Sequence, residues 1–381
     1  MSALTSDMVE YARRVQPELL QLIRDLCAVP APSNHEEKRA EFCRDWFVRN
    51  GFTDVRVDAA LNVLAPVGVD LDGTDELDVM MAHTDTVFPD TYPLPFREEG
   101  GFMYCPGVGD DTANLAVLMI CARYYREHPV SGRRGILFVA NSGEEGLGNL
   151  KGSRKIMETF AGRVREFVSL DSACMNRLVT RAVGSHRYRV TVRTEGGHSF
   201  GSFGNRNAIH SLAAMITLLY SVKVPAEPGS KTTYNVGLIS GGTSVNTIAQ
   251  SAEMMYEYRS DSRACLAKME KLFKSTIETF RATGVEVEVE KVGDRPCGGE
   301  VDAKRLEALR ERYRASVRET VALEPFDGAS STDCNIPLSL GVPAICFGVC
   351  RSKGAHTREE QLDTTSLTDG CRLLLDFLYR R

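Results

Sequence analysis

The sequence has no run of about 18 consecutive apolar residues, the length that a membrane-spanning helix requires. Its first residues, Met1–Asp7, lack the basic start and the following apolar stretch of a secretory signal peptide. The eleven cysteines include no C-x-x-C pair, and their odd number does not suit a closed disulfide framework. These absences predict a protein that is neither secreted nor membrane-spanning and that works in a reducing cytoplasm.

The chain also has no excess of basic residues, because its formal net charge is −5. Nucleic-acid-binding domains usually carry a basic patch or stripe, so the charge gives no electrostatic argument for a nucleic-acid partner. Apolar residues make up 43% of the chain and charged residues 25%, which is ordinary for a globular protein with a sizeable core. The length of 381 residues is long for one domain and sufficient for two.

Residues 1–183 alternate helical and strand patterns. Buried strands separated by helices predict an α/β domain built on a largely parallel sheet. The periodicity and the turn residues place its elements as follows: helices at Glu18–Cys27 and Asn114–Tyr125, a helix cap at Ser33–Glu37, and strands at Val55–Asp58, Asn62–Ala65, Leu77–Ala82, Ile136–Ala140 and Phe167–Leu170.

Residues 184–294 follow a different order of patterns: strand, helix, strand, strand, helix, strand. This order is typical of the split βαβ, ferredoxin-like sandwich, and it predicts an inserted α+β domain. Residues 295–381 then return to the first domain. The expected elements are strands at His186–Thr194, Thr233–Ile239, Ala252–Arg259, Val285–Val292 and Ala344–Phe347, and helices at Asn207–Val222, Ala264–Thr283, Ala303–Val321 and Ser366–Tyr379.

A histidine and an aspartate, His83 and Asp85, directly follow the apolar run that ends at Ala82. A metal-bound imidazole usually donates its other N–H to a carboxylate, and His-x-Asp brings such a carboxylate within reach. The motif therefore indicates a metal ligand and its supporting partner. The alternative is a loop histidine beside a turn aspartate.

Similar donors recur where other strands and helices begin or end. Gly107–Thr112 precedes the apolar helix, Asn141–Gly146 follows one buried strand, and Phe167–Ser172 and Gly354–Thr357 lie at two further ends. Ligands of α/β proteins gather at the carboxyl ends of parallel strands, so we expect these segments to meet.

Five of these donors mix imidazole and carboxylate groups, which suits zinc, cobalt or manganese better than calcium. A hydrolytic two-metal site needs roughly two protein ligands per ion and one bridging carboxylate. The five predicted metal ligands are His83, Asp110, Glu145, Asp171 and His356.

Glu144 stands directly before Glu145 and is left over from this ligand set. Adjacent glutamates cannot easily bind the same ion, so one can coordinate while the other takes a proton from the attacking water. A solvated acidic turn is the alternative for the pair. Together with the other motifs, the pair favours Glu144 as a general base.

The motifs occur along the chain in this order: His83-Thr84-Asp85, Gly109-Asp110-Asp111, Gly143-Glu144-Glu145-Gly146, Asp171, Gly197-His198-Ser199 and His356. This order and spacing resemble the M20 family of metallopeptidases, which includes peptidase T-like tripeptidases and glutamate carboxypeptidases. The resemblance covers nearly the whole chain. It implies a catalytic domain of the zinc-exopeptidase type with an inserted lid and dimerisation domain.

The resemblance also implies a role for each residue of the site. Asp110 would bridge two divalent ions, most often zinc. His83 and Asp171 would complete one metal site, and Glu145 and His356 the other. Glu144 would be the general acid/base, Asp85 would orient His83, and the Asp110–Asp111 peptide would be cis.

The inserted domain would supply His198, which in the family steadies the tetrahedral oxyanion, often from the neighbouring subunit of a homodimer. The alternative for His198 is a turn histidine that caps the next helix. Asn246 and Arg259 match positions that hold substrate carboxylate or amide groups, although a surface salt bridge is an equal alternative for Arg259. Thr332 resembles the threonine of a loop that lines the family's substrate pocket, except that serines replace its glycines.

The resemblance predicts an exopeptidase that hydrolyses short peptides, because Asp171 is an aspartate as in the peptidases of the family, where many deacylases have glutamate. An N-acyl amino acid deacylase that uses the same site remains the alternative. A non-catalytic binding module would be expected to have lost a ligand or the base, and none is missing. The sequence departs from the family pattern at Thr112–Asn114 and at Tyr258. These positions surround the expected ligand set, so we expect the differences to affect substrate specificity more than the chemistry.

Overall fold

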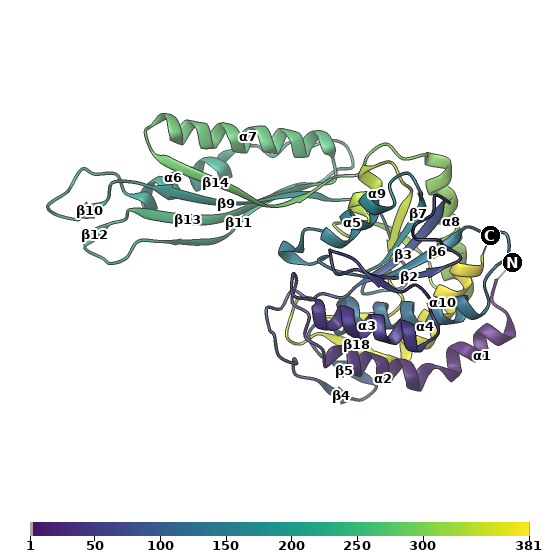
Figure 1. The fold of residues 1–381 in the computed structure, drawn as a ribbon. Coiled ribbons are helices and arrows are strands. Elements are labelled where there is room, and N and C mark those ends of the chain that lie inside the picture. The colour runs from purple at the N-terminus through teal and green to yellow at the C-terminus, as the bar shows by residue number, and fades with distance from the viewer. Residues whose placement is uncertain (1–2, 381) are drawn as a thin grey trace. The chain divides into compact units, whose positions relative to one another are not determined.

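The computed structural model describes residues 3–380 of the chain (Figure 1). These residues form two compact units, each with its own hydrophobic core. Unit 1 comprises Met1–Arg181 and Gly299–Arg381, and unit 2 comprises Ala182–Gly298. The range 184–294 that was expected as an inserted domain lies within unit 2.

Unit 1 is built on an eight-stranded sheet with the strand order β1-β2-β6-β3-β7-β16-β8-β15. The centre of the sheet is parallel, because β3 pairs with β6 and β7, and β7 pairs with β16, all in parallel. The α/β fold class with a largely parallel sheet is therefore confirmed. The strands are β1 (Arg56–Val57), β2 (Val63–Val67), β3 (Leu77–His83), β6 (Gly135–Asn141), β7 (Val164–Leu170), β8 (Arg177–Ala182), β15 (Phe326–Ser330) and β16 (Ala344–Phe347).

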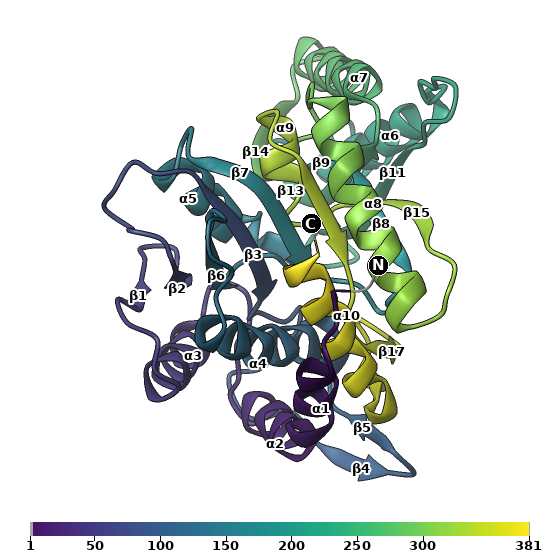
Figure 2. The ribbon, with the colours of Figure 1, turned by 90° about the vertical axis from the view of Figure 1, so that its right-hand side faces the viewer.

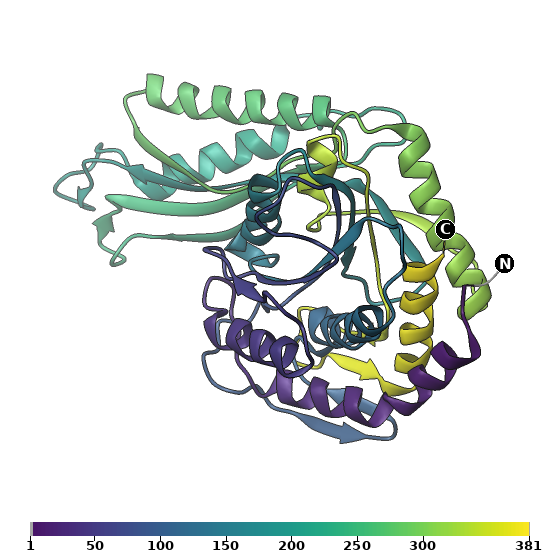
Figure 3. The same ribbon diagram turned by 45° about the vertical axis from the view of Figure 1, so that its right-hand side comes forward.

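Helix α4 (Ala113–Glu127) contacts β3, β6 and β7 and is buried along most of its length. Helix α2 (Gln16–Cys27) contacts its outer side, and α10 (Leu367–Tyr379) lies between α4 and α8 (Ala303–Thr320) (Figure 2). The two ends of the described chain are side by side, since Ala3 donates its N–H to Asp376 of α10 at 2.8 Å (Figure 3). The other helices of unit 1 are α1 (Ser6–Arg14), α3 (Glu37–Arg49), α5 (Lys151–Thr159) and α9 (Asn335–Ser339).

A small antiparallel sheet in unit 1 joins two segments that are far apart in sequence. Its strand order is β17-β18-β5-β4, and the pair β18 and β5 sets Gln361 opposite Tyr104. The loop between β17 and β18 thus lies next to the segment that precedes α4. The strands are β4 (Arg97–Glu99), β5 (Phe102–Tyr104), β17 (Arg351–Lys353) and β18 (Gln361–Asp363).

Unit 2 contains a four-stranded antiparallel sheet with the order β11-β13-β9-β14 and two helices. Along the chain the elements follow the expected βαββαβ order, and this strand order is that of the ferredoxin-like sandwich. The alternating burial of β13 reflects the apolar and polar alternation of its sequence. The elements are β9 (Gly184–Arg193), α6 (Ala208–Ser221), β11 (Thr232–Gly241), β13 (Ser251–Ser260), α7 (Arg263–Ala282) and β14 (Glu286–Arg295), with the short strands β10 (Gly197–His198) and β12 (Thr247–Ile248).

Local sequence signals explain several element boundaries. Helix α7 begins after Ser262, whose hydroxyl accepts the N–H of Cys265 at 3.1 Å and so caps the helix. Asn207 caps α6 in the same way, with its side-chain oxygen accepting from Ile209 and His210. Within residues 3–380, no helix combines the length and the apolar character that crossing a membrane requires.

Candidate functional site

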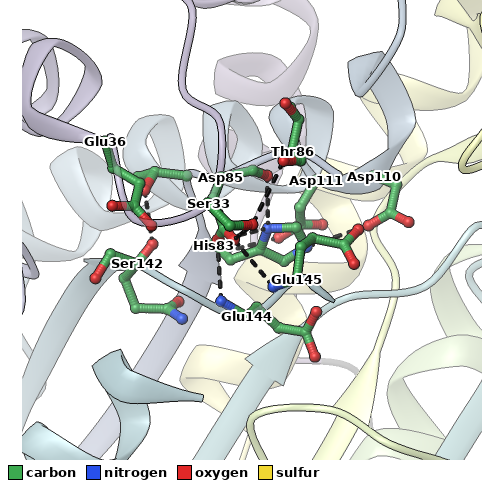
Figure 4. A network of polar contacts seen from close by, with 12 residues as sticks. Ser33, Glu36, His83, Asp85, Thr86, Asp110, Asp111, Ser142, Glu144 and Glu145 are labelled. Carbon is green, nitrogen blue, oxygen red and sulfur yellow. Dashed lines mark hydrogen bonds and ion pairs between the residues drawn. The ribbon is translucent and has the colours of Figure 1, made fainter. Parts of the chain in front are cut away.

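Three neighbouring strands bring the predicted ligands together at one edge of the unit 1 sheet. His83 is the last residue of β3, Glu144 and Glu145 follow the end of β6, and Asp171 follows the end of β7. Because β3 pairs in parallel with both β6 and β7, their carboxyl ends meet at this edge. Motifs that are far apart in the sequence therefore form one cluster (Figure 4).

Asp110 lies between two histidines. One of its carboxylate oxygens is 3.1 Å from Nε2 of His83, and the other is 3.2 Å from Nε2 of His356. His356 Nε2 is also 2.9 Å from a carboxylate oxygen of Glu145. A single carboxylate that faces two different nitrogen donors, one on each oxygen, has the arrangement that a bridging ligand requires.

The donor atoms of this cluster are close enough to share ions. Those of His83, Asp110 and Glu145 lie within 4.8 Å of one another, and so do those of His83, Asp111 and Asp171. Imidazole nitrogens and carboxylate oxygens at such separations are the ligands that zinc, cobalt and manganese take. The residues therefore fit a site for divalent cations.

The buried acidic groups of the cluster shift one another's pKa and that of His83. Burial, together with the charges of Asp110 and Glu145, raises the pKa of Asp171 to about 7. Burial alone would lower the pKa of His83, but its acidic neighbours, Asp111 and Asp110 among them, raise that pKa well above its ordinary value. Divalent cations at these positions would compensate this charge.

The carboxylate of Asp85 holds the backbone of the two glutamates. It is fully buried and accepts the N–H of Glu144 at 3.0 Å and the N–H of Glu145 at 2.9 Å, together with the hydroxyl of Ser33 at 2.7 Å (Figure 4). The closest partner of Nδ1 of His83 is the backbone carbonyl of Asp85 at 3.0 Å, with the carboxylate at 3.5 Å. The main chain of Asp85 therefore orients the imidazole more directly than its side chain does.

Asp111 is a further member of the cluster that the sequence reasoning did not single out. Its carboxylate accepts the backbone N–H of His83 at 2.9 Å and the side-chain amide of Asn114 at 2.6 Å. The peptide between Asp110 and Asp111 is cis, as the family resemblance predicts. A second aspartate beside Asp110 was a visible signal in the sequence, but its partner in β3 depends on the tertiary fold.

Two residues predicted to contact substrate lie next to each other within unit 2. His198 ends β10, and its neighbour Ser199 donates its N–H to the carbonyl of Asn246 at 2.9 Å. The side chain of His198 is exposed, and its Nδ1 accepts the N–H groups of Phe200 and Gly201 at 3.3 and 3.2 Å. The fold thus joins the His198 turn to the Asn246 turn, and Nε2 of His198 points away from these backbone contacts.

Arg259 forms the salt bridge that was the alternative for it. Its guanidinium binds both carboxylate oxygens of Glu257, at 2.9 and 3.0 Å. Thr332 is buried, and its hydroxyl accepts the N–H of Cys334 at 3.3 Å, at the start of α9. The adjacent Asp333 accepts the side-chain amide of Asn141, the last residue of β6, at 2.6 Å. The Thr332 loop therefore reaches the edge where the ligands gather.

The chain is similar to known proteins over nearly its whole length. The chain is 26% identical over 376 residues to a succinyl-diaminopimelate desuccinylase from Corynebacterium glutamicum, with 94% of this chain and 95% of the relative covered. Its fold is similar to that of a tripeptidase from Staphylococcus aureus, with a TM-score of 0.76 and 21% identity over 96% of this chain and 99% of the other.

A third likeness is to a Bacillus subtilis protein described as a dinuclear metal-binding peptidase from the M20 family. That comparison has a TM-score of 0.65 and 14% identity, and it covers 96% of this chain and 98% of the other. A model of peptidase family M20/M25/M40 matches residues 79–380, which is most of the chain, and the protein therefore belongs to this family.

Proposed function

We propose that this protein is a two-metal hydrolase that cleaves amide bonds in short peptides as an exopeptidase. The observation that carries the proposal is the position of Asp110, whose two oxygens face His83 and His356 at 3.1 and 3.2 Å. Glu144 stands beside this cluster with its backbone held by Asp85. A bridging carboxylate next to a buried glutamate is the arrangement that metal-assisted hydrolysis uses.

In this proposal His83 and Asp171 would hold one ion, and Glu145 and His356 would hold the other. Asp110 would contribute to both sites. The mixed nitrogen and oxygen donors support zinc, with cobalt and manganese as alternatives.

When bound, the two ions supply Lewis acidity that lowers the pKa of a water and polarises the amide carbonyl. Glu144 accepts one proton of the attacking water as the C–O bond forms. It then returns that proton to the amine nitrogen as the C–N bond breaks, so that the glutamate ends the cycle as a carboxylate. The burial of Glu144, at 4% exposure, keeps bulk water from competing for this proton.

The substrate contacts remain proposals of the same kind. His198 steadies the oxyanion, either from its own chain or from a partner subunit. Asn246 lies beside it and binds a substrate amide or carboxylate. Arg259 would have to leave Glu257 to bind a substrate carboxylate. Thr332 would contribute through the O–H of its hydroxyl, because its backbone N–H and carbonyl are both hydrogen-bonded to Asn335.

A deacylase of N-acyl amino acids is the second candidate. It is favoured by the 26% identity to a desuccinylase over nearly the whole chain. The peptidase candidate is favoured by Asp171, since family deacylases tend to have glutamate at that position. Both candidates use the same ions and the same base, and they differ in whether the substrate carries a free ammonium group.

The test is a hydrolysis panel of free di- and tripeptides, N-acyl amino acids and carboxypeptidase substrates with the zinc- or cobalt-loaded protein. Chelator-sensitive cleavage of free peptides supports the peptidase, and cleavage of acylated amino acids alone replaces it with the deacylase. Glu144→Gln should keep the bound ions and the fold but lower kcat at least about 100-fold. Appreciable residual turnover in this variant would remove Glu144 from the base role.

We also propose that two copies of the chain associate through unit 2. Strand β11 lies at the edge of its sheet, and its side chains Leu238 and Ile239 are 69% and 58% exposed. Tyr220 on the neighbouring helix α6 is exposed as well. Exposed apolar side chains on an unpaired edge strand need a partner to cover them. Sedimentation equilibrium should give a dimer for the native chain and a monomer for Leu238→Lys, and a monomeric native chain would contradict the proposal.

A cytoplasmic location is part of the same proposal. All eleven cysteines are free thiols, and ten of them are buried. Unpaired thiols persist in a reducing compartment.

A further inference from the structure

Glu360 is a buried carboxylate that holds the segment carrying Asp110. It lies at the end of the loop between β17 and β18 and has no exposed surface. One carboxylate oxygen accepts the N–H of Gly109 and the N–H of Asp110, both at 2.8 Å. The other oxygen accepts the N–H of Gly107 at 2.6 Å. Three backbone amides of one short segment are therefore fixed by a single side chain.

The main chain of Glu360 contacts the same segment. Its carbonyl accepts the N–H of Cys105 at 3.2 Å, just before the three amides that its carboxylate binds. On the β17 side the fit is tight, because a Cβ atom on Gly109 would lie 2.2 Å from the Cβ of Ser352. The segment from Cys105 to Asp110 is thus confined between Glu360 and β17, which leaves the Asp110 carboxylate little freedom of position.

The loop that ends at Glu360 also carries His356. Thr357 donates its N–H to the carbonyl of Gly354 at 3.0 Å, which closes a tight turn with His356 in the left-handed region at φ 65°. Glu360 therefore connects two segments that are distant in sequence, one bearing Asp110 and the other bearing His356. The Nε2 atom of His356 and a carboxylate oxygen of Asp110 are 3.2 Å apart.

We propose that Glu360 is a positioning residue of the metal site, which sets the distance between Asp110 and His356 so that both can bind the same ion. The inference rests on the proposed two-metal function. The Glu360 carboxylate acts on the site through the backbone amides of Gly107, Gly109 and Asp110. Residues that orient metal ligands in this way typically change metal affinity or activity about 10- to 100-fold when they are replaced.

A purely structural anchor would make the same hydrogen bonds, so the test needs a matched control. Asp376 provides one in the same unit. It is also fully buried, and its carboxylate accepts the backbone N–H groups of Ala3 and Leu4 at 2.8 and 3.2 Å. Asp376 lies on α10, outside the two segments that bear the ligands. Asp376→Asn should therefore lower stability without changing metal binding.

The experiment measures zinc affinity of the full-length protein by competition with a chromogenic chelator, with melting temperatures recorded in parallel. In Glu360→Gln, one oxygen can still accept amides while the new NH₂ group faces an N–H donor. We expect Glu360→Gln to bind zinc about 10- to 100-fold more weakly than the native protein. Asp376→Asn should match the native zinc affinity. The cobalt-loaded Glu360→Gln protein should also show an altered visible absorption spectrum.

The inference would be overturned if Glu360→Gln had the zinc affinity and the cobalt spectrum of the native protein, even if its melting temperature were lower. Equal losses of zinc affinity in both variants would overturn it as well, because they would trace the effect to stability. If Glu360→Gln does not fold, Glu360→Asp decides by the same two readouts, since it keeps the charge but is too short to reach all three amides. A native protein that binds none of zinc, cobalt and manganese would instead refute the proposed function.

Discussion

Replacement of Asp85 by asparagine should disable the site while leaving every predicted ligand and the base in place. The Asp85 carboxylate accepts the N–H groups of Glu144 and Glu145 at 3.0 and 2.9 Å, in a position without solvent access. Asparagine has the same shape, but its NH₂ group must face one of these two donors. The segment carrying Glu144 and Glu145, the proposed base and a proposed metal ligand, then loses one of its two fixed points.

The usual energies of such hydrogen bonds give the size of the effect. A hydrogen bond to a charged acceptor contributes about 1.5 to 3 kcal/mol, and a buried donor left without a partner adds a penalty of similar size. A combined loss of about 3 kcal/mol corresponds to about a 100-fold decrease in kcat/KM, since about 1.4 kcal/mol equals a factor of ten. Ser33→Ala is the matched control because it removes only the neutral hydroxyl that donates to the same carboxylate at 2.7 Å. Its effect should stay within about fivefold, as expected for about 1 kcal/mol.

The assay is steady-state hydrolysis of the best substrate of the panel at saturating zinc, with zinc affinity measured separately. Asp85→Asn should show the larger loss in kcat, because the position of Glu144 matters in the transition state. A kcat/KM within about threefold of the native value, well short of the factor expected for a lost charged hydrogen bond, would refute the reasoning. Equal losses of kcat/KM in Ser33→Ala and Asp85→Asn would refute it as well.

Three further predictions concern stability. Burial opposes ionisation of Asp376, but hydrogen bonds from Arg380, Ser316 and the backbone hold its folded-state pKa below the ordinary value. The ionised Asp376 therefore stabilises the folded protein above the unfolded-state pKa of about 3.9. This stabilisation is lost as pH falls through the folded-state pKa. Urea unfolding should show Asp376→Asn destabilised by about 3 kcal/mol at pH 7, with the difference narrowing below about pH 4. Gly370→Ala would place a Cβ 1.7 Å from the carbonyl oxygen of Val349. This clash should lower the free energy of unfolding by about 3 kcal/mol. An unchanged thermal midpoint of the variant would contradict the close contact. Removal of metal by a chelator should lower the melting temperature. Zinc at about 100 times its Kd should then raise the free energy of unfolding by about 2.7 kcal/mol. A melting temperature that does not change with zinc would contradict the metal site.

Elements with strong local signals were predictable from the sequence. The strand expected at Ala252–Arg259 is β13, one residue longer at each end, because its alternation of apolar and polar residues is regular. The helix expected at Ala264–Thr283 is α7, since Ser262 supplies a cap and the apolar positions recur with helical spacing. Four donor residues could be found for the same reason, because each follows a strand or precedes a helix that the pattern marks: His83, Asp110, Glu145 and Asp171. His356 lies in the loop between β17 and β18, which the pattern does not mark.

Features that depend on pairing between distant segments were not predictable. The sheet of β4, β5, β17 and β18 consists of three-residue strands with no periodicity of their own, so only the tertiary fold assembles it. Strands β8 and β15 were also missed; they lie at one end of the large sheet, where only the tertiary fold pairs them with the predicted strands. The role of Asp85 was only partly foreseen. Its proximity to His83 is visible in the sequence, whereas its bonds to Glu144 and Glu145 require β3 and β6 to be neighbours.

Buried carboxylates perform two tasks in this site, and the two are linked. The backbone N–H of His83 is bound by Asp111, that of Asp110 by Glu360, and that of Glu145 by Asp85. The backbone of each of these predicted ligands is thus fixed by an acid from another segment of the chain.

Such an arrangement concentrates negative charge, and without cations the mutual repulsion and the burial of these groups oppose folding. Bound divalent ions would remove this penalty, so the acids that orient the ligands also raise the affinity for the ions. Replacing any one of the three by its amide should therefore weaken metal binding, although none of them needs to be a ligand.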